Sequence, residues 1–146
     1  MNEEEVTEQL KRDFPEGVSD FSFPRKGMVR FSADRDRLKD VCTRLKDIGF
    51  EQISLISALD WREHFECVYH ITSYSFGIVA EVHTKIPVDD PKVDSVTPVW
   101  PGANFHEREA YDMMGIVFEG HPDLRRILLP DDFTFYPLRK NFREGE

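Results

Sequence analysis

Two successive stretches of alternating apolar and polar residues constrain the fold of this 146-residue chain most strongly. Every second residue from Phe65 to Ile71 is apolar (Phe, Cys, Tyr, Ile), and a similar alternation runs from Phe76 to Ile86. Alternation with period two indicates strands that pack one face against a hydrophobic core and turn the other face away from it. The short link between the two stretches favours antiparallel pairing, because parallel strands need a longer crossover. The sequence therefore predicts a β-hairpin here.

The clearest helix is predicted over 34–48. Apolar residues recur there at i, i+3, i+4 and i+7 from Leu38 to Ile48, and the opposite face is charged. Gly49 suits the left-handed position that commonly ends a helix. A second helix is predicted from Asn2, which can cap it, to the residue before Pro15.

Further strands are predicted over 18–23, 28–31 and 53–58, where short apolar runs lie between turn residues. Helices and strands do not alternate regularly, so the fold class is α+β. We expect a mostly antiparallel sheet of about five strands, with helices packed on one face and an irregular C-terminal segment.

Charge and composition exclude several classes of protein. The chain has 28 acidic and 19 basic residues, a net charge of −9, which argues against binding nucleic acid. Residues 1–20 are acidic and residues 121–143 are basic, so the second segment can dock on an acidic partner or form a solvated surface. The chain has no apolar run of about 20 residues and starts with acidic residues, so we expect a soluble, intracellular protein.

The sequence offers few means of holding a cofactor. Cys42 and Cys67 lie far apart, without the short C-x-x-C spacing typical of metal centres, and are predicted to be buried reduced thiols. His70 and His83 can approach each other across the hairpin, but satisfied or exposed histidines are the simpler interpretation. The motif that starts at His106 resembles H-E-x-x-H but has Ala110 in place of the second histidine. We therefore expect no cofactor on this chain.

A third helix is predicted to begin at Asn104 and end at Gly115. Asn104 can cap it, and Glu107 can complete a capping box. Arg108 and Asp112 stand at i and i+4 and are expected to pair. Its apolar side is expected to consist of Phe105, Tyr111 and Met114.

The same region carries a specific resemblance. Residues 107–116 (EREAYDMMGI), followed by 118–128 (FEGHPDLRRIL), resemble the signature of the 30-kDa subunit of respiratory complex I, which in bacteria is the C subunit of NADH:quinone oxidoreductase. Residues 100–104 (WPGAN) and 137–140 (PLRK) are also similar to that family. The likeness is dense over 95–143 and looser over 1–90. Residues 133–136 depart from the usual pattern, and this departure favours a compact archaeal or hydrogenase-type relative.

The resemblance implies a non-catalytic accessory subunit in the hydrophilic arm of a membrane-bound, ion-translocating NADH/F420H2:quinone-type oxidoreductase. Such a subunit scaffolds the electron-transfer subunits and lies peripherally on the cytoplasmic face. It implies iron–sulfur clusters and a flavin or nickel–iron centre on partner subunits, not here. The expected partners are a large hydrogenase-like subunit of the 49-kDa type and a small cluster-bearing subunit.

Two alternatives remain open. One is the equivalent subunit of a ferredoxin-dependent membrane-bound hydrogenase. The other is a small stand-alone enzyme that uses an acid–base cluster of Glu107, Glu109, Asp112 and His121. Within the single expected domain, residues 1–90 would form the α+β core and residues 91–146 the signature helix and the partner-docking segment.

Candidate interface or signature residues follow from the same resemblance. Arg108 is expected to bind within the chain, to Asp112 or Glu109, and Arg125 or Arg126 to hold a loop through Asp123. Arg139 and Lys140 are expected at the interface. Gly115 and Gly120 are expected to serve backbone geometry. The complete set is Glu107, Arg108, Glu109, Asp112, Gly115, Gly120, His121, Pro122, Asp123, Arg125, Arg126, Pro137, Leu138, Arg139 and Lys140.

Overall fold

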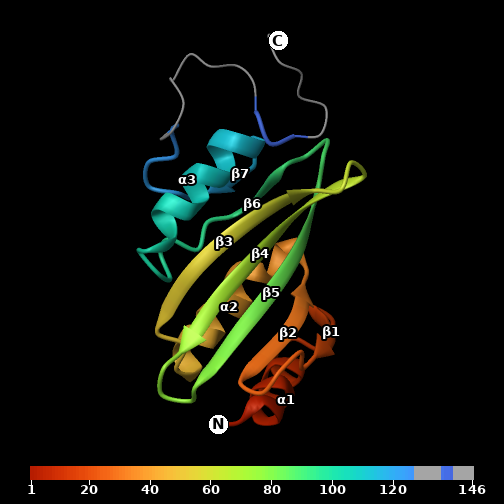
Figure 1. The fold of residues 1–146 in the computed structure, drawn as a ribbon, viewed down its shortest axis with the longest axis vertical. Coiled ribbons are helices and arrows are strands. Elements are labelled where there is room, and N and C mark those ends of the chain that lie inside the picture. The colour runs from red at the N-terminus through yellow and green to blue at the C-terminus, as the bar shows by residue number, and fades with distance from the viewer. Residues whose placement is uncertain (127–135, 140–146) are drawn as a thin grey trace.

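A computed structural model describes residues 1–126 and 136–139 of the chain and shows a five-stranded sheet with helices packed on one face (Figure 1). In chain order the elements are α1 (Glu3–Asp13), β1 (Val18–Ser22), β2 (Met28–Ala33), the 3₁₀ turn η1 (Arg35–Arg37), α2 (Leu38–Ile48), β3 (Gln52–Asp60), β4 (His64–Ser73), β5 (Ile78–Pro87), β6 (Lys92–Asp94), α3 (Ala103–Met114) and β7 (Val117–Glu119). In the described part of the chain, no helix has both the length and the apolar character needed to cross a membrane.

The order of strands in the large sheet is β1-β2-β5-β4-β3. The predicted hairpin is confirmed: β4 and β5 pair antiparallel, and β3 adds to β4 in the same sense. One pair, β2 with β5, is parallel, so the sheet is mixed but mostly antiparallel, as expected, and this pair does not conflict with the argument from short links. The reason is that link length governs only strands adjacent in sequence, whereas β2 and β5 are separated by α2 and two strands. The α+β class is confirmed.

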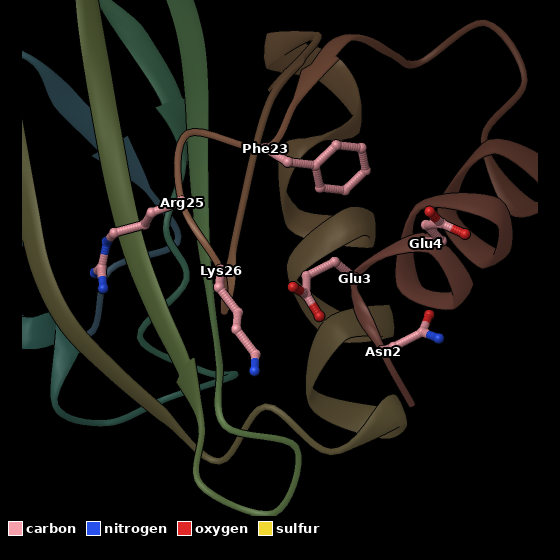
Figure 2. Close-up of a pocket in the computed structure, with 6 residues that line it drawn as sticks. All are labelled: Asn2, Glu3, Glu4, Phe23, Arg25 and Lys26. Carbon is pink, nitrogen blue, oxygen red and sulfur yellow. The ribbon is translucent and has the colours of Figure 1, made fainter.

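The first helix begins as the sequence predicts. Asn2 accepts a hydrogen bond from the Glu5 backbone at 2.9 Å, and its own N–H donates to the Glu5 side chain at 3.2 Å. This capping box fixes the start of α1 next to the turn between β1 and β2 (Figure 2). There Gly27 N–H donates to the Glu3 carboxylate at 3.1 Å, which lowers the pKa of Glu3. The groove beside this contact is open and lined mostly by charged residues.

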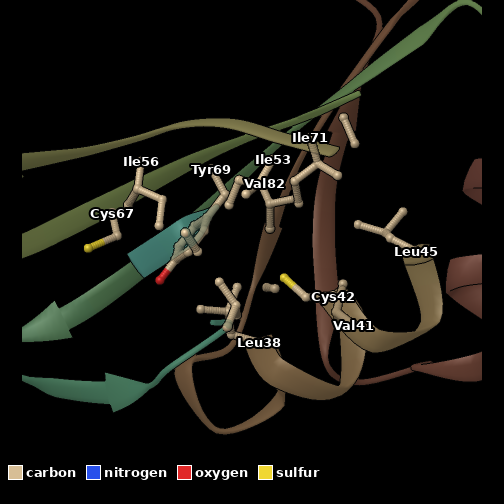
Figure 3. Close-up of a cluster of buried hydrophobic side chains, with 14 of the residues drawn as sticks. Leu38, Val41, Cys42, Leu45, Ile53, Ile56, Cys67, Tyr69, Ile71 and Val82 are labelled. Atoms are coloured by element: carbon tan, nitrogen blue, oxygen red, sulfur yellow. The ribbon is translucent and has the colours of Figure 1, made fainter. Parts of the chain in front are cut away.

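The core lies between the sheet and α2. Leu38, Val41, Cys42 and Leu45 point from α2 toward Tyr69 and other sheet residues (Figure 3). The predicted 34–48 helix is confirmed in its main part, with a 3₁₀ turn as its first three residues, and Gly49 ends it at φ 135°. Both cysteines are free and fully buried, as expected, and burial raises the pKa of each thiol.

The opposite face of the sheet carries a charged cluster around Glu81. His70 and His83, predicted to approach each other across the hairpin, both bind this carboxylate, at 3.0 and 3.1 Å. Arg30 on β2 also pairs with it. Burial alone would raise the pKa of Glu81, but the hydrogen bonds from Arg30, His70 and His83 outweigh it and hold the pKa at about 2.

Replacing this carboxylate gives a pH-dependent prediction. A carboxyl group with a depressed pKa stabilises the fold above its ordinary value of 4.5, and this contribution is lost as the pH falls through about 2. Glu81→Gln is therefore expected to lower the free energy of unfolding by about 2 kcal/mol at pH 6. The difference from the wild type should shrink between pH 4.5 and pH 2 in urea titrations. A difference that stays constant with pH would contradict the assignment.

Candidate functional site

The signature segment forms α3, which lies against β3 (Figure 1). The helix begins at Ala103, whose N–H bonds the Trp100 carbonyl at 2.9 Å, and no side chain caps it. The predicted capping box of Asn104 and Glu107 is therefore wrong. The Trp100 indole is anchored to the Phe50 carbonyl at 3.0 Å, so the turn starts the helix earlier than the sequence suggests and rotates Glu107 into the interior.

Glu107 is fully buried and acts as a hydrogen-bond acceptor for the loop before α3. Its carboxylate accepts from Ser95 Oγ at 2.6 Å, Val96 N at 2.8 Å and Thr97 Oγ1 at 2.7 Å. Burial is the largest influence on this group and raises its pKa, although the three donors oppose that effect. The sequence does not single out Ser95 and Thr97, because hydroxyl residues in a turn carry no signal of the carboxylate they bind.

Asp112 and Arg126 form the buried ion pair of the site. Arg126 Nη1 lies 3.0 Å from Asp112 Oδ1 and also 3.0 Å from the Asp112 carbonyl. The predicted pair of Arg108 with Asp112 is therefore wrong. Arg108 instead donates to the carbonyls of residues 125 and 126, at 3.2 and 3.4 Å. Asp112 faces the interior, where Arg126 enters from the following loop, while Arg108 stays on the partly exposed side.

The turn that follows β7 is held by local contacts. Arg125 pairs with Asp123 at 3.0 Å, as predicted, but the two side chains are 65% and 60% exposed. The ring of His121 is occupied on both sides: Nδ1 accepts from Asp123 N–H at 2.9 Å, and Nε2 lies 3.4 Å from the Asn104 carbonyl. Since Nδ1 accepts, the ring proton is on Nε2. Gly120 and Pro122 lie exposed in the same turn.

Residues 136–139 fold back on the end of α3. Leu138 N–H donates to the Met113 carbonyl at 3.0 Å, and Arg139 Nε donates to the Met114 carbonyl at 2.6 Å. The Arg139 guanidinium also lies over the rings of Phe65 and Tyr136, at 5.1 and 4.8 Å. Arg139, expected at the interface, thus binds groups of its own chain, whereas Lys140 lies outside the described residues.

Gly115 allows this close approach, and its substitution gives a matched comparison. It has φ 74°, and a Cβ there would lie 2.7 Å from Arg139 Nη2 and 2.8 Å from the Tyr136 ring. Gly120 has φ 80°, but among the described residues no atom lies within 4 Å of its Cβ position. Gly115→Ala is expected to cost about 3 kcal/mol and Gly120→Ala about 1 kcal/mol in chemical denaturation. Equal losses would show that segment 136–139 is not packed on Gly115.

The exposed side of α3 differs from the predicted apolar side. Phe105 is 58% exposed, while Met114 is buried as expected and Tyr111 is half-buried. Ala103, Glu107, Ala110 and Met114 form the inward stripe. Their spacing of four, three and four residues was the available signal that Phe105 points outward. Pro137 is half-buried, and Leu138 beside it is 61% exposed. We call Phe105, Glu109 and Leu138 the outer α3 surface.

The site thus brings most of the signature residues into one network. Glu107, Asp112 and Arg126 are buried in it, Arg108 and Arg139 bind backbone carbonyls, and Glu109 stays exposed. Among the described residues, no three histidine, cysteine or acidic side chains are grouped to hold a metal ion. The network can rigidify a surface, since its buried carboxylates and imidazole are already engaged in hydrogen bonds.

Comparison with known proteins gives a consistent result. Residues 31–146 match the family model described as respiratory-chain NADH dehydrogenase, 30 Kd subunit. The C subunit of the F420H2 dehydrogenase of Methanosarcina mazei is 36% identical over 146 residues, covering 97% of this chain and 92% of that protein. The C subunit of the NADH-quinone oxidoreductase of Saccharopolyspora erythraea is 39% identical over 127 residues, and the match spans 82% of this chain but only 51% of that protein.

A solved structure shows the same fold in an assembly. A chain of the membrane-bound sulfane sulfur reductase, an archaeal respiratory membrane complex, aligns with a TM-score of 0.85 at 29% identity. The alignment covers 97% of this chain and 86% of that one. The relatives therefore include subunits of membrane respiratory complexes.

Proposed function

Because this chain belongs to the respiratory-chain NADH dehydrogenase 30 Kd subunit family, we propose that it is a non-catalytic accessory subunit of a membrane-bound, ion-translocating oxidoreductase of the NADH/F420H2:quinone type. It would lie peripherally in the hydrophilic arm on the cytoplasmic face. There it would scaffold a large hydrogenase-like subunit of the 49-kDa type and a small cluster-bearing subunit. In this proposal the partners hold the iron–sulfur clusters and the flavin or nickel–iron centre, and this chain holds no cofactor.

One observation carries the scaffolding role: the polar signature residues fix the shape of α3 and the segments around it. Glu107 binds three donors of the 95–97 loop, Arg126 is buried against Asp112, and Arg139 binds the end of α3. Polar networks satisfied in this way rigidify a structure. The rigid frame presents the outer α3 surface, where large apolar side chains such as Phe105 and Leu138 are exposed to a partner.

The same network argues against the stand-alone enzyme. A general base needs a free lone pair within reach of a substrate proton. Glu107 is fully buried, Asp112 is paired with Arg126, and His121 uses Nδ1 to accept from the Asp123 backbone. Of the four residues in that cluster, Glu107 and His121 do lie together, with His121 Nε2 4.0 Å from Glu107 Oε1, but both side chains are fully buried and already hydrogen-bonded, and only Glu109 is exposed.

A second candidate differs in the electron donor or acceptor of the complex. The archaeal sulfur reductase neighbour, which is not named as an NADH or F420H2 dehydrogenase, matches nearly the whole of this chain, and this supports the equivalent subunit of a ferredoxin-dependent membrane-bound hydrogenase as the alternative. Both candidates assign the same accessory role to this chain. They differ in the partner that receives the first electrons.

Affinity purification tests the proposal. The full-length tagged chain, expressed in its native host, is expected to co-purify at equal stoichiometry with the large and small electron-transfer subunits. The isolated chain should be colourless, with no stoichiometric iron or flavin. Assaying the purified complex with NADH, F420H2, reduced ferredoxin and hydrogen identifies the donor. Turnover by the isolated chain, or flavin or iron bound to it, would overturn the accessory role.

A matched pair of variants locates the docking surface. Phe105→Asp, on the outer α3 surface, is expected to lower the recovery of partner subunits at least about tenfold, because an aromatic anchor of the interface is lost. Phe23→Asp changes a similarly exposed phenylalanine beside α1 and should leave recovery unchanged. Equal recovery of partner subunits with both variants would show that α3 is not part of the interface.

A further inference from the structure

A second surface is left uncovered by the helices that the structure describes. Figure 1 shows α1 and α2 packed on one face of the large sheet, and no described helix lies on the other face. Strand pairing shows which side chains share that second face. Leu55 stands opposite His70, His70 opposite Glu81, and Glu81 opposite Arg30. We call the side chains of this face on β2, β3, β4 and β5 the open sheet face.

The open sheet face carries an exposed apolar stripe along β3. Leu55 and Leu59 lie on it, opposite His70 and Glu66, and are 41% and 40% exposed. Their Cα atoms are separated by about 13 Å of strand. Trp61 follows the last residue of β3, in the turn between β3 and β4, and is 57% exposed. Several large apolar side chains that stay exposed along one row of a sheet face point to protein association, whereas a single one needs no explanation.

The charged side chains around Glu81 on the same face are already satisfied by one another. Glu81 binds Arg30, His70 and His83. Glu66 lies 3.4 Å from His83. Burying a polar group is costly when it loses its hydrogen bonds, but these groups keep theirs when the face is covered. The Glu81 cluster can therefore be covered without losing its hydrogen bonds, while the exposed Lys85 can keep its ammonium group in water at the edge of the contact.

Charge decides the kind of partner. The four acidic, lysine and arginine side chains that β2, β3, β4 and β5 place on the face are Arg30, Glu66, Glu81 and Lys85, two of each sign. The chain as a whole has a net charge of −9. The face is thus a balanced patch on an acidic protein. A balanced, partly apolar surface complements an uncharged protein surface, not a polyanion or an anionic lipid layer.

We propose that the open sheet face is a second docking surface, separate from the outer α3 surface, and that it binds a flat, uncharged, aliphatic face of a neighbouring protein subunit in the same complex. This inference rests on the proposed accessory function. The Leu55–Leu59 stripe supplies the apolar contact, and the Glu81 cluster holds the three strands β2, β5 and β4 together beneath the partner. One chain would then bridge two neighbours, which is what a scaffold requires.

Hydroxyl-radical footprinting of the full-length chain tests the proposal. The oxidation of Leu55, Leu59 and Trp61 is measured in the isolated chain and in the complex purified through a tag on this chain. These residues are expected to be protected in the complex, while Phe23, 49% exposed beside α1, stays reactive. A complex that contains its electron-transfer subunits but leaves the two leucines as reactive as in the isolated chain overturns the proposal.

Variants supply an independent measurement. Leu55→Asp/Leu59→Asp changes two partly exposed side chains, and the melting temperature of the variant is measured to check that the fold survives. Recovery of at least one partner subunit should fall at least about tenfold, as expected when two leucines lose their burial. Phe23→Asp serves as the control. Recovery equal to the control overturns the inference.

The remaining outcomes are distinguishable. If sedimentation shows that the isolated chain is a dimer and Leu55→Asp/Leu59→Asp makes it a monomer, the occupant is a second copy and the proposal is wrong. If the wild-type chain recovers no electron-transfer subunit under any condition, the proposed function fails first, and this inference fails with it.

Discussion

Replacing Arg126 with methionine is expected to lower the free energy of unfolding by about 3–5 kcal/mol, because it removes the buried guanidinium that pairs with the Asp112 carboxylate. Arg126 and Asp112 are almost completely buried, and the guanidinium binds both the carboxylate and the backbone carbonyl of Asp112 at 3.0 Å. Methionine keeps an unbranched apolar stem and removes the guanidinium group. Urea denaturation followed by circular dichroism measures the loss.

The adjacent arginine provides the matched control. Arg125 forms an ion pair of the same length, 3.0 Å, but both it and Asp123 are more than half exposed. Arg125→Met should therefore change the free energy of unfolding by no more than about 0.5 kcal/mol. A double-mutant cycle of Arg126→Met with Asp112→Ala should give a large favourable coupling. Equal effects of the two single arginine variants would contradict the buried pair.

Glu107→Ala is expected to destabilise the fold by about 3 kcal/mol, since it removes the carboxylate that accepts from the backbone N–H of Val96 and from the hydroxyls of Ser95 and Thr97. A loss of this size corresponds to a melting temperature lower by roughly 10 °C in a chain of this length. Calorimetry measures it directly. Glu109→Ala, an exposed glutamate two residues along the same helix, should shift the melting temperature by no more than about 2 °C.

The pH dependence of stability distinguishes the ionisation of Glu107 from the hydrogen bonds that a side chain of the same shape can make. Burial raises the pKa of Glu107 above its ordinary value of 4.5, so the folded protein binds this proton more tightly than the unfolded chain does. That contribution to stability is present below pH 4.5 and is lost as the pH rises through the raised value. Glu107→Gln should lack this loss. A stability profile of Glu107→Gln that parallels the wild type above pH 4.5 would show that Glu107 does not titrate in this way.

Much of the fold could be predicted from local pattern. The alternation of residues 65–71 and 76–86 depends only on which face of a strand each side chain takes, and it predicted β4, β5 and their pairing correctly. The spacing of Leu38 to Ile48 likewise predicted α2, and Asn2 marked the start of α1. The parallel pair of β2 with β5 could not be read in this way, because no local pattern records which distant strand fills the next place in a sheet.

In the candidate site, too, contacts between residues close in sequence could be predicted, and contacts between distant residues could not. Sequence located the signature residues and the pair of Arg125 with Asp123, which are two residues apart and meet in one turn. The sequence predicted the wrong partner for Asp112, because Arg108 lies four residues before it and this spacing favours a pair on one face of a helix. Which arginine pairs with Asp112 depends on the rotation of α3 about its own axis. That rotation is set by the hydrogen bond of the Trp100 indole and by the buried stripe from Ala103 to Met114.

The sequence by itself therefore determined the fold class, the family and the segment that carries the family signature, because each of these depends only on residue types and their spacing along the chain. Only the tertiary structure decided that Glu107 and Arg126 are buried, that Arg139 binds the end of α3, and that Phe105 and Leu55 face outward. Burial and pairing are properties of packed surfaces. A side chain's partner across the core depends on how whole elements are rotated and stacked, and short-range periodicity does not encode that.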